Sequence, residues 1–244
     1  MKPMSRRPRP VDLLVFGAHP DDIEFGCGGV IARETQSGRS AHFVVCSKGE
    51  SGTRGTPRQR VAEARGAAAL LGAGIEFAAL GGDAHFEESL THVLTLARLI
   101  RRHAPAVLLA PTCEPNQHPD HAKLGRMVRD AARLARYGGV KELRGLPAHA
   151  VGQLFFYAVS PGAEPGVSGR ILMDVSPESV MSAWRAAMAA HASQMATRDY
   201  LDLLVTRALL RGHEAGVGHA IALWPNDAPV FESLASLQRA ARRL

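Results

Sequence analysis

Cysteine is scarce in this sequence, and features of secreted and membrane-spanning proteins are missing. Three of the 244 residues are cysteine (Cys27, Cys46 and Cys113), and no pair has the Cys-x-x-Cys spacing. A disulfide framework is therefore not predicted, and a reducing cytoplasm is the expected location. No apolar run approaches the roughly 20 residues that span a bilayer, and the basic, proline-rich start has no apolar segment typical of a secretory signal. We expect no membrane insertion.

Two further classes of protein are not indicated. The sequence contains no Gly-x-Ser-x-Gly motif, which argues against a serine hydrolase of the α/β type. The net charge of +6 raises the question of nucleic-acid binding, but no recognised binding motif accompanies it. Part of the excess lies in the terminal segments, at Arg6, Arg7, Arg9, Arg239, Arg242 and Arg243. We expect no nucleic-acid partner.

The composition is that of a globular protein. Apolar residues make up 46% of the chain and charged residues 21%, both ordinary proportions for such proteins. A chain of 244 residues buries a full core without disulfides or other staples. No internal repeat or long linker divides it. We expect a basic tail without fixed structure at residues 1–10 and a single domain over residues 11–244.

Apolar runs alternate with helical patterns along the chain. Strands are predicted at residues 11–17, 41–46, 75–79 and 107–111. Helices are predicted between and after them, at residues 23–37, 57–71, 88–103 and 122–136. Such alternation predicts an α/β fold with a Rossmann-like, mostly parallel sheet flanked by helices.

The last third of the chain has a looser pattern. Strands are expected at residues 153–159 and 170–175, and helices at residues 177–191 and 199–210. We interpret this part as a C-terminal lobe that closes over a site formed by the first part.

The segment GAHPDDIEFGCGG, residues 17–29, carries the strongest functional signal. It places His19, Asp21 and Asp22 on a turn directly after a predicted buried strand. Open α/β folds bind ligands at the carboxyl ends of their strands. A second apolar run, at residues 107–111, leads into a polar segment with His118, Pro119, Asp120 and His121. Two strand ends with the same chemistry predict one site.

These residue types suit a metal centre. A zinc ion that catalyses hydrolysis takes three ligands from His, Asp or Glu and keeps one position open for water. His19 and Asp22 offer two ligands from one turn, because their spacing at a helix start brings both side chains to one side; His121 offers the third. Asp21 then remains as a general base and His118 as an acid or oxyanion partner. We expect Zn²⁺, with Fe²⁺ as an alternative.

Each segment also has a structural interpretation. Pro-Asp-Asp before a helix is ordinary N-terminal chemistry, with proline in the first turn and carboxylates that meet the helix dipole. His118-Pro119-Asp120 is equally suited to cap the helix that follows it. The metal interpretation depends on the two segments lying together.

Other features are expected to serve packing. The glycines of residues 26–29 lack the dinucleotide-binding spacing and are interpreted as sites of close helix contact. Cys113 is interpreted as a small core residue, although it lies near the second polar segment. Several histidines are isolated in the sequence and are expected to be surface or hydrogen-bonded residues: His42, His85, His92, His103, His149 and His213.

The paired motifs resemble those of the PIG-L/LmbE family of zinc-dependent N-deacetylases, which act mostly on N-acetylglucosamine-type substrates. Residues 47–56 with the helix after them resemble the family's second block. Residues 190–194, which include His191, and residues 214–218 resemble its C-terminal blocks. The similarity is greatest to the branch that deacetylates a GlcNAc-malate in bacillithiol biosynthesis, and it covers about residues 11–229.

The resemblance also implies roles for individual residues. It implies that His19, Asp22 and His121 bind zinc and that Asp21 is the general base, which agrees with the assignment from the residues themselves.

Three further roles come from the resemblance. It implies that His118 stabilises the oxyanion and protonates the leaving amine, while Asp120 orients and charges His118. It also implies that Arg54 binds sugar hydroxyls or an acidic aglycone. The expected partner is a small amino-sugar substrate, and the sequence leaves homo-oligomer formation open.

One departure from the pattern concerns substrate choice. Close relatives usually have an aromatic residue, an alanine and a glutamate where this chain has residues 219–221, His-Ala-Ile. Two other functions therefore stay open: a related amidase for a thiol conjugate or another N-acyl group, and a non-enzymatic nucleotide- or sugar-binding module.

Overall fold

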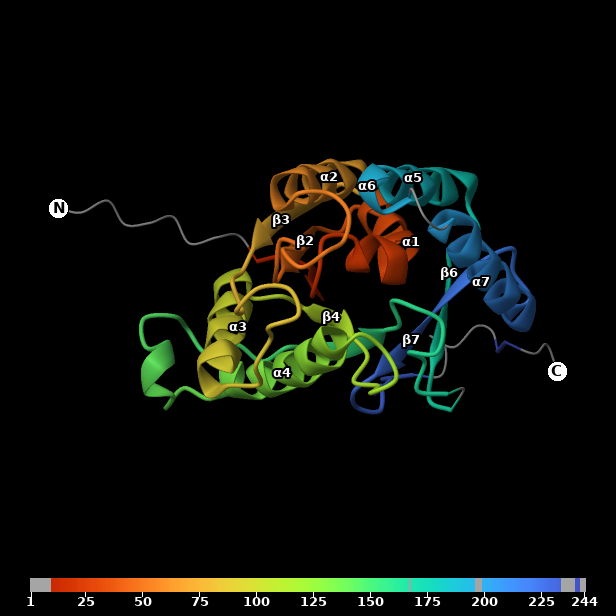
Figure 1. Ribbon diagram of the computed structural model, residues 1–244. Coiled ribbons are helices and arrows are strands. Elements are labelled where there is room, and N and C mark those ends of the chain that lie inside the picture. Colours follow the sequence, from red (N-terminus) through yellow and green to blue (C-terminus); the bar gives the residue numbers. More distant parts are fainter. Residues whose placement is uncertain (1–9, 167, 196–198, 234–239, 242–244) are drawn as a thin grey trace.

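A single sheet forms the centre of the molecule (Figure 1). The computed structural model describes residues 10–166, 168–195, 199–233 and 240–241, so the predicted tail at residues 1–10 lies, except for Pro10, outside the described residues. The sheet has seven strands in the order β3-β2-β1-β4-β5-β7-β6. They are β1 (Leu13–Gly17), β2 (Ala41–Val45), β3 (Ala73–Phe77), β4 (Val107–Pro111), β5 (Gln153–Tyr157), β6 (Ile171–Asp174) and β7 (Ala220–Pro225).

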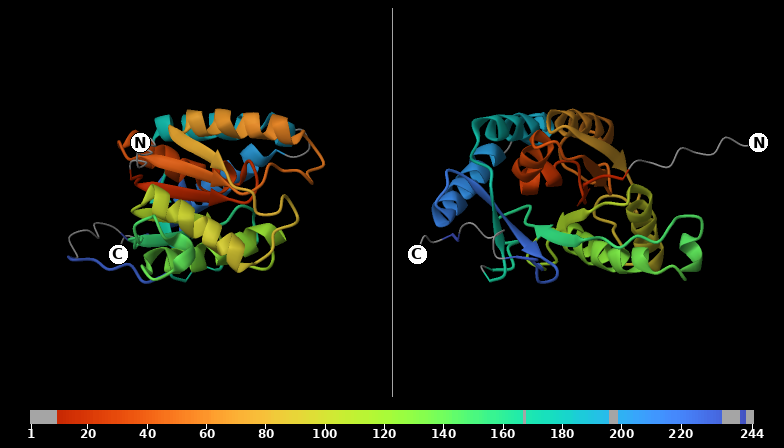
Figure 2. Two further views of the ribbon diagram at one scale, coloured as in Figure 1. Left: turned by 90° about the vertical axis from the view of Figure 1, so that its left-hand side faces the viewer. Right: turned by 180° about the vertical axis from the view of Figure 1, so that it is seen from behind.

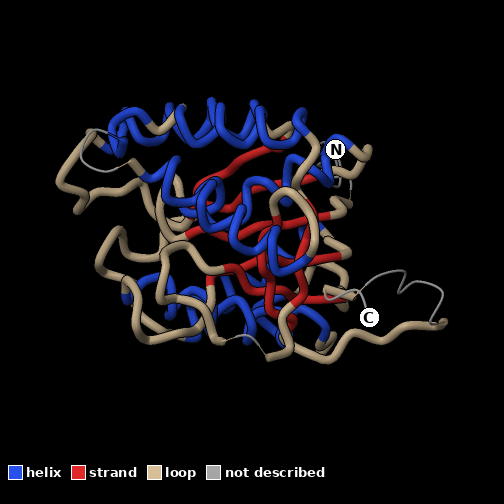
Figure 3. The backbone as a smooth tube through the Cα atoms, turned by 90° about the vertical axis from the view of Figure 1, so that its right-hand side faces the viewer, coloured by secondary structure: helices blue, strands red, loops and turns tan. Residues whose placement is uncertain are grey.

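Helices cover both faces of this sheet (Figures 2 and 3). One face carries α1 (Asp22–Gln36), α2 (Pro57–Leu70), α5 (Glu178–Ala189), the short α6 (Ala192–Met195) and α7 (Tyr200–Ala215). The other carries α3 (Leu90–His103) and α4 (Pro119–Arg136), followed by a 3-10 turn at Lys141–Leu143. Within the described ranges, no helix combines the length and the apolar character that crossing a bilayer requires.

The central strand β1 is buried on both faces, which explains why its sequence is a nearly continuous apolar run. Because side chains alternate along a strand, Leu13 and Val15 enter the core under α1 and α5, and Leu14 and Phe16 enter the core under α3 and α4. The sheet thus separates two hydrophobic cores.

The predicted fold class is confirmed. β1 to β5 pair in parallel, and all elements predicted before residue 137 are found with ends displaced by at most three residues. The largest displacement is at α4, which begins at Pro119 instead of residue 122. Proline suits this first helical position because its φ is already helical and its missing N–H would have no partner there.

The C-terminal third contains one strand that the sequence analysis missed. β7 lies between β5 and β6 and is antiparallel to both. The β7 segment is a short apolar run without polar alternation, and such a run does not distinguish a strand from a buried helix. Its partner β5 lies more than 60 residues earlier in the chain, so the pairing leaves no local signal in the sequence. The strands of the last third extend the central sheet, while its helices α6 and α7 form a wall of the cavity described below.

Glycines let α1 lie close to its neighbours. A Cβ on Gly26 would stand 2.2 Å from Cδ2 of Tyr157, and one on Gly28 would stand 2.8 Å from Cδ1 of Trp184. Real side-chain atoms do not approach so closely, so only glycine fits at Gly26 without a shift of its surroundings. The interpretation of residues 26–29 as a close-packing segment is confirmed.

The same two aromatic residues hold the start of α1 through hydrogen bonds. The buried Tyr157 hydroxyl donates to the carbonyl oxygen of Phe16 at 2.7 Å, and Nε1 of Trp184 donates to the carbonyl oxygen of Glu24 at 2.7 Å. Both acceptors flank the turn between β1 and α1, so the packing fixes the turn that carries His19, Asp21 and Asp22.

This packing predicts opposite effects for two glycine-to-alanine changes in helices. Gly26→Ala should lower the free energy of unfolding by about 1–3 kcal/mol, the usual cost of overpacking. Gly66→Ala on α2, where no atom lies within 4 Å of the added Cβ, should raise it by roughly 0.5–1 kcal/mol. Urea unfolding followed by circular dichroism measures both, and equal changes in the two variants would contradict the close contact.

Candidate active site

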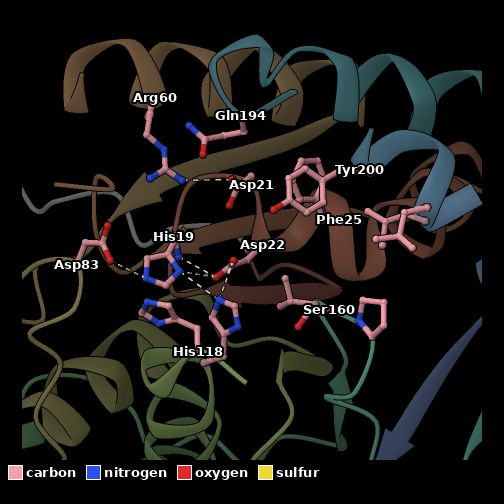
Figure 4. A pocket seen from close by; sticks show the side chains of 15 residues that line it. His19, Asp21, Asp22, Phe25, Arg60, Asp83, His118, Ser160, Gln194 and Tyr200 are labelled. Carbon is pink, nitrogen blue, oxygen red and sulfur yellow. Dashed lines mark hydrogen bonds and ion pairs between the residues drawn. The ribbon is translucent and has the colours of Figure 1, made fainter. Parts of the chain in front are cut away.

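A cavity of about 310 Å³ opens beyond the carboxyl ends of the central strands (Figure 4). Its lining comes from the β1–α1 turn, the start of α4, the loop after β3, and α2. The segment after β5 and residues of α6 and α7 complete it. The two polar segments predicted to lie together do so here, at the edge where open α/β sheets bind ligands.

The β1–α1 turn holds its two carboxylates differently. Oδ2 of Asp22 accepts hydrogen bonds from the backbone N–H groups of Ala18 and His19, both at 2.8 Å. Asp21 has a φ of 127°, and its side chain makes no capping hydrogen bond to α1. A non-glycine residue in this region stores about 1–3 kcal/mol of backbone strain, as residues at functional sites often do. Asp21 thus stands at the N-cap position of α1 without using its side chain as a cap.

Three buried donor atoms converge where the turn meets α4. Nδ1 of His19 lies 3.1 Å from Nε2 of His121, and that nitrogen lies 3.0 Å from Oδ1 of Asp22. Nδ1 of His19 lies 3.5 Å from Oδ2 of Asp22. Donors about 2.0–2.1 Å from a tetrahedral ion stand roughly 3.3 Å apart. The three side chains, each at most 7% exposed, therefore have the spacing and the chemistry to hold a small divalent cation.

The other ring nitrogen of His19 faces two more carboxylates. Nε2 lies 3.1 Å from Oδ1 of Asp83 and 3.4 Å from Oδ2 of Asp120. An imidazole that binds a metal through one nitrogen typically has a carboxylate or carbonyl group at the other, which fixes its tautomer and ring orientation. Asp83 was missed in the sequence, although it follows a pair of glycines after the third strand and so belongs to the same sheet edge.

The pKa values of the two adjacent carboxyls, Asp21 and Asp22, are shifted in opposite directions. Burial opposes ionisation of Asp22, but His121 and His19 outweigh it and hold its pKa well below the usual range. Burial and the neighbouring charge of Asp22 raise the pKa of Asp21 to about 6, against the opposing effect of Arg60. Burial disfavours the charged form of His19, but the charge of Asp22 and hydrogen bonds with Asp120 outweigh it and raise its pKa to about 12. Asp22 thus suits a ligand and Asp21 a proton acceptor.

Arg60 holds Asp21 in place. Its Nη2 donates to the Pro20 carbonyl oxygen at 3.1 Å and to Oδ2 of Asp21 at 3.2 Å, and the residue is only 5% exposed. The glycine-rich loop makes room for the guanidinium: a Cβ on Gly49, whose φ is 72°, would stand 2.1 Å from Nη1 of Arg60.

The structure places Arg54 differently from the expectation for a substrate-binding residue. Its side chain is exposed in the loop before α2, and its carbonyl oxygen accepts from Nε2 of Gln194 at 3.0 Å. The cavity is lined by Arg60 and by Gln194. Arg60 lies on the buried stripe of α2 together with Ala64 and Ala67, and an arginine on such a stripe is the signal that would have found it.

His118 lies at the rim of the cavity, in edge-to-face contact with the ring of His19 at 4.7 Å. Its Nδ1 accepts from the backbone N–H of Asp120 at 3.3 Å, so it does cap α4, and its Nε2 is left for the cavity. Burial, followed by the charges of His19 and His121, lowers the pKa of His118.

Asp120 is placed for a different partner than expected. Its Oδ2 accepts from the backbone N–H of Ala84 at 2.7 Å and faces His19, whereas its contact with His118 runs through its own backbone N–H. The carboxylate acts on His118 through its charge, which raises the pKa of that imidazole against the larger lowering effects.

Two other sequence candidates lie outside the cavity lining. His191 is fully buried behind it, with Nε2 3.5 Å from Oε2 of Glu24. Cys113 packs against the core beneath α3 and α4, as interpreted.

The opposite wall of the cavity is largely apolar. It consists of residues from β5's carboxyl end, α1 and α7, including Phe25, Val159, Tyr200 and Leu204. The rings of Phe25 and Tyr200 stack with centroids 5.4 Å apart (Figure 4). The site is thus two-sided, with the convergent polar groups on one side and an apolar surface on the other.

Several known proteins are similar to this chain in sequence. The family model described as PIG-L: GlcNAc-PI de-N-acetylase matches residues 14–132. The diacetylchitobiose deacetylase of Thermococcus kodakarensis is 26% identical over 159 residues, 59% of this chain and 59% of that protein. The 4-oxalmesaconate hydratase of Pseudomonas putida is 29% identical over 140 residues, 52% of this chain and 54% of that protein. The matches to the first three curated relatives span 32 to 59% of their lengths.

The similarity to a solved structure extends further. The crystal structure of a conserved protein from Thermus thermophilus has a TM-score of 0.79 and 31% sequence identity, and the match covers 91% of this chain and 97% of that one. The family model in turn matches the segment that contains His19, Asp22 and His121. On these two grounds, the chain belongs to the PIG-L family.

Proposed function

We propose that this protein is a metal-dependent N-deacetylase that removes the acetyl group from an N-acetylglucosamine-type substrate. The observation that carries the proposal is the convergence of His19, Asp22 and His121 beside a second carboxylate, Asp21, whose pKa is raised to about 6. The family description and the name of the chitobiose deacetylase relative support the substrate class.

The metal ligands in this proposal are His19, Asp22 and His121. Two imidazole nitrogens and one carboxylate oxygen suit Zn²⁺, with Fe²⁺ as the alternative. A divalent cation bound there polarises an amide carbonyl and lowers the pKa of water in the site. Nε2 of His121 and Nδ1 of His19, each within 3.5 Å of a carboxylate oxygen of Asp22, support this donor set.

Asp21 and His118 transfer the protons in this proposal, Asp21 as the general base and His118 as the general acid. Asp21 accepts a proton as water adds to the carbonyl carbon, and Arg60 keeps that carboxylate aimed at the cavity. His118 faces the substrate from the rim, where a protonated imidazole stabilises the oxyanion and then donates its proton to the departing nitrogen. The C–N bond breaks, and acetate and a free amine result.

The sugar is held by the polar side of the cavity in this proposal. Asp83, Arg60 and Gln194 surround it with acceptors and donors suited to hydroxyl groups. The finer assignment is the malyl glycoside of N-acetylglucosamine, which rests on the sequence resemblance and on the cationic Arg60 beside the cavity.

A second candidate is a related amidase for a larger N-acyl group or a thiol conjugate. The apolar wall of Phe25, Tyr200 and Leu204 favours it, since a bare acetyl group does not fill such a surface. The test incubates the protein with N-acetylglucosamine, diacetylchitobiose, the malyl glycoside and longer N-acyl glucosamines, and detects carboxylate and primary amine separately. Water addition to an unsaturated acid, the reaction named for the hydratase relative, yields no amine.

Removing a ligand should remove the ion. We expect Asp22→Ala and His121→Ala to lose the metal that survives gel filtration and to lose activity with it, since a three-ligand site does not survive as two. Elemental analysis measures the metal. Asp130→Ala, an exposed carboxylate on α4, serves as the control; full metal content in the Asp22 or His121 variant would overturn the ligand set.

Removing the base should leave the ion in place. We expect Asp21→Asn to keep its metal and to lose on the order of 10²–10⁴ in kcat, the usual contribution of a positioned general base. Asp130→Asn is the matched control. Loss of metal from the Asp21 variant would instead make Asp21 a ligand.

Replacing Arg60 and replacing Arg54 should affect kcat differently. Arg60→Ala should lower kcat by about 10–10²-fold because Asp21 loses its orientation, whereas Arg54→Ala, exposed in the loop, should change kcat little. Steady-state kinetics on the best substrate, with the unfolding temperature of each variant as a stability check, decides between them. The reverse order of effects would restore Arg54 as the substrate-binding residue.

A further inference from the structure

A second group of metal-binding side chains lies at the other end of the sheet. His42 is the second residue of β2, Glu76 is on β3, and His103 is the last residue of α3 (Figure 1). His42 and His103 are isolated in the sequence, and the fold brings them together with Glu76. The contact of His103 with Glu76 agrees with the expectation of hydrogen-bonded histidines. The register of the edge strands and the length of α3 bring the three side chains together. The sequence alone does not show that they are neighbours.

The two imidazoles point at one carboxylate oxygen. Nε2 of His103 lies 2.5 Å and Nε2 of His42 lies 3.3 Å from Oε1 of Glu76. The two rings stack with centroids 4.4 Å apart and an interplanar angle of 27°. Nε2 of His42 is buried and has no hydrogen-bond partner among the described residues. Two nitrogens and an oxygen therefore converge, and the contact of His42 with the carboxylate oxygen is the longer of the two.

A glycine beside the cluster leaves room for the His42 ring. A Cβ on Gly74 would stand 2.5 Å from Nδ1 of His42, so the absence of a side chain there leaves the space that the imidazole occupies. Arg102 binds the other oxygen of Glu76, Oε2, and leaves Oε1 for the two histidines. A cation on the far oxygen orients a ligating carboxylate in the manner of outer-shell partners in metal sites.

The carboxylate is held in its ionised form. Burial opposes this, but the contacts with His103, His42 and Arg102 outweigh burial and keep the pKa of Glu76 well below its usual range. An ionised carboxylate with two imidazoles is a donor set that Zn²⁺ and its transition-metal neighbours bind.

We propose that His42, Glu76 and His103 form a second site for a divalent transition metal such as Zn²⁺, separate from the catalytic centre. Nε2 of each histidine and Oε1 of Glu76 supply three ligands, all mutually within 4.8 Å, and solvent completes the shell at this half-buried position. The ion joins the end of α3 to the two strands at the edge of the sheet, so its role is structural. The alternative is an ion-pair network that binds no metal.

The experiment counts Zn²⁺ ions in the full-length chain. Metal-stripped protein is titrated with Zn²⁺ at pH 8, because Zn²⁺ competes with protons for its ligands, and binding is followed by calorimetry. Wild type should bind two ions, and the Asp22→Ala and His42→Ala variants one each. The Asp22→Ala/His42→Ala double variant should bind none. His213→Ala, which removes an exposed histidine on α7, is the matched control and should bind two.

The residues outside the described ranges contain no histidine, cysteine, aspartate or glutamate, so they offer no side chain of these kinds to confuse the count. In the Asp22→Ala background, His42→Ala or His103→Gln should weaken the remaining ion by at least about 10-fold, since even outer-shell changes cost 10–100-fold. Retention of the catalytic ion by His42→Ala shows that this variant folds; if it does not fold, His103→Gln takes its place.

Saturating Zn²⁺ should also raise the unfolding temperature of the Asp22→Ala variant, because an ion that binds only the folded chain stabilises it. A wild-type count of one ion with none in Asp22→Ala would overturn the second site and leave the ion-pair network. An unchanged affinity in His42→Ala would do the same. These outcomes are independent of whether the catalytic centre deacetylates amino sugars.

Discussion

The Asp22 carboxylate is the constraint on which the rest of the site depends. One oxygen accepts two backbone N–H groups of its own turn, at 2.8 Å each, and the other meets His121 of α4 at 3.0 Å. One side chain therefore closes the β1–α1 turn and ties it to a helix on the opposite face of the sheet. The oxygen of a neutral amide in its place could still accept both backbone donors, but its NH₂ group would face His121 where the second carboxylate oxygen now lies. The chemistry of the site therefore depends on the carboxylate.

The strained turn needs rigid support, and α1 supplies it. A φ of 127° at Asp21 persists only where the surrounding structure outweighs its cost. Close contacts of the α1 glycines with Tyr157 and Trp184, and the hydrogen bonds of those residues to both flanks of the turn, provide that support. Core packing outside the cavity lining thus supports the backbone of the turn, and Arg60 orients the Asp21 carboxylate on it.

The polar turn after a buried strand was readable from the sequence because strand, turn and helix follow one another in it. Residues that reach the site from elsewhere were not. Arg60 enters from the first turn of α2, beside a glycine-rich loop that leaves room for its guanidinium, and Arg54 is exposed in that loop. Asp83 arrives on the loop after the third strand, and β7 inserts between strands that precede it. The positions of Asp83 and β7 depend on long-range register, for which a single sequence has no local signal. For Arg60, its place on the buried stripe of α2 was a signal that the sequence did offer.

The two sides of the cavity come from different parts of the chain. The convergent polar groups from His19 to His121 lie before residue 133, within the segment that the family model matches. The apolar wall, apart from Phe25, comes from residues after 150. Under the proposed function, the proposed metal ligands and proton-transfer groups therefore come from one stretch of the chain, and most of the apolar surface beside them comes from another. Substitutions in the later stretch would change the apolar wall while the side chains of the polar cluster stay the same.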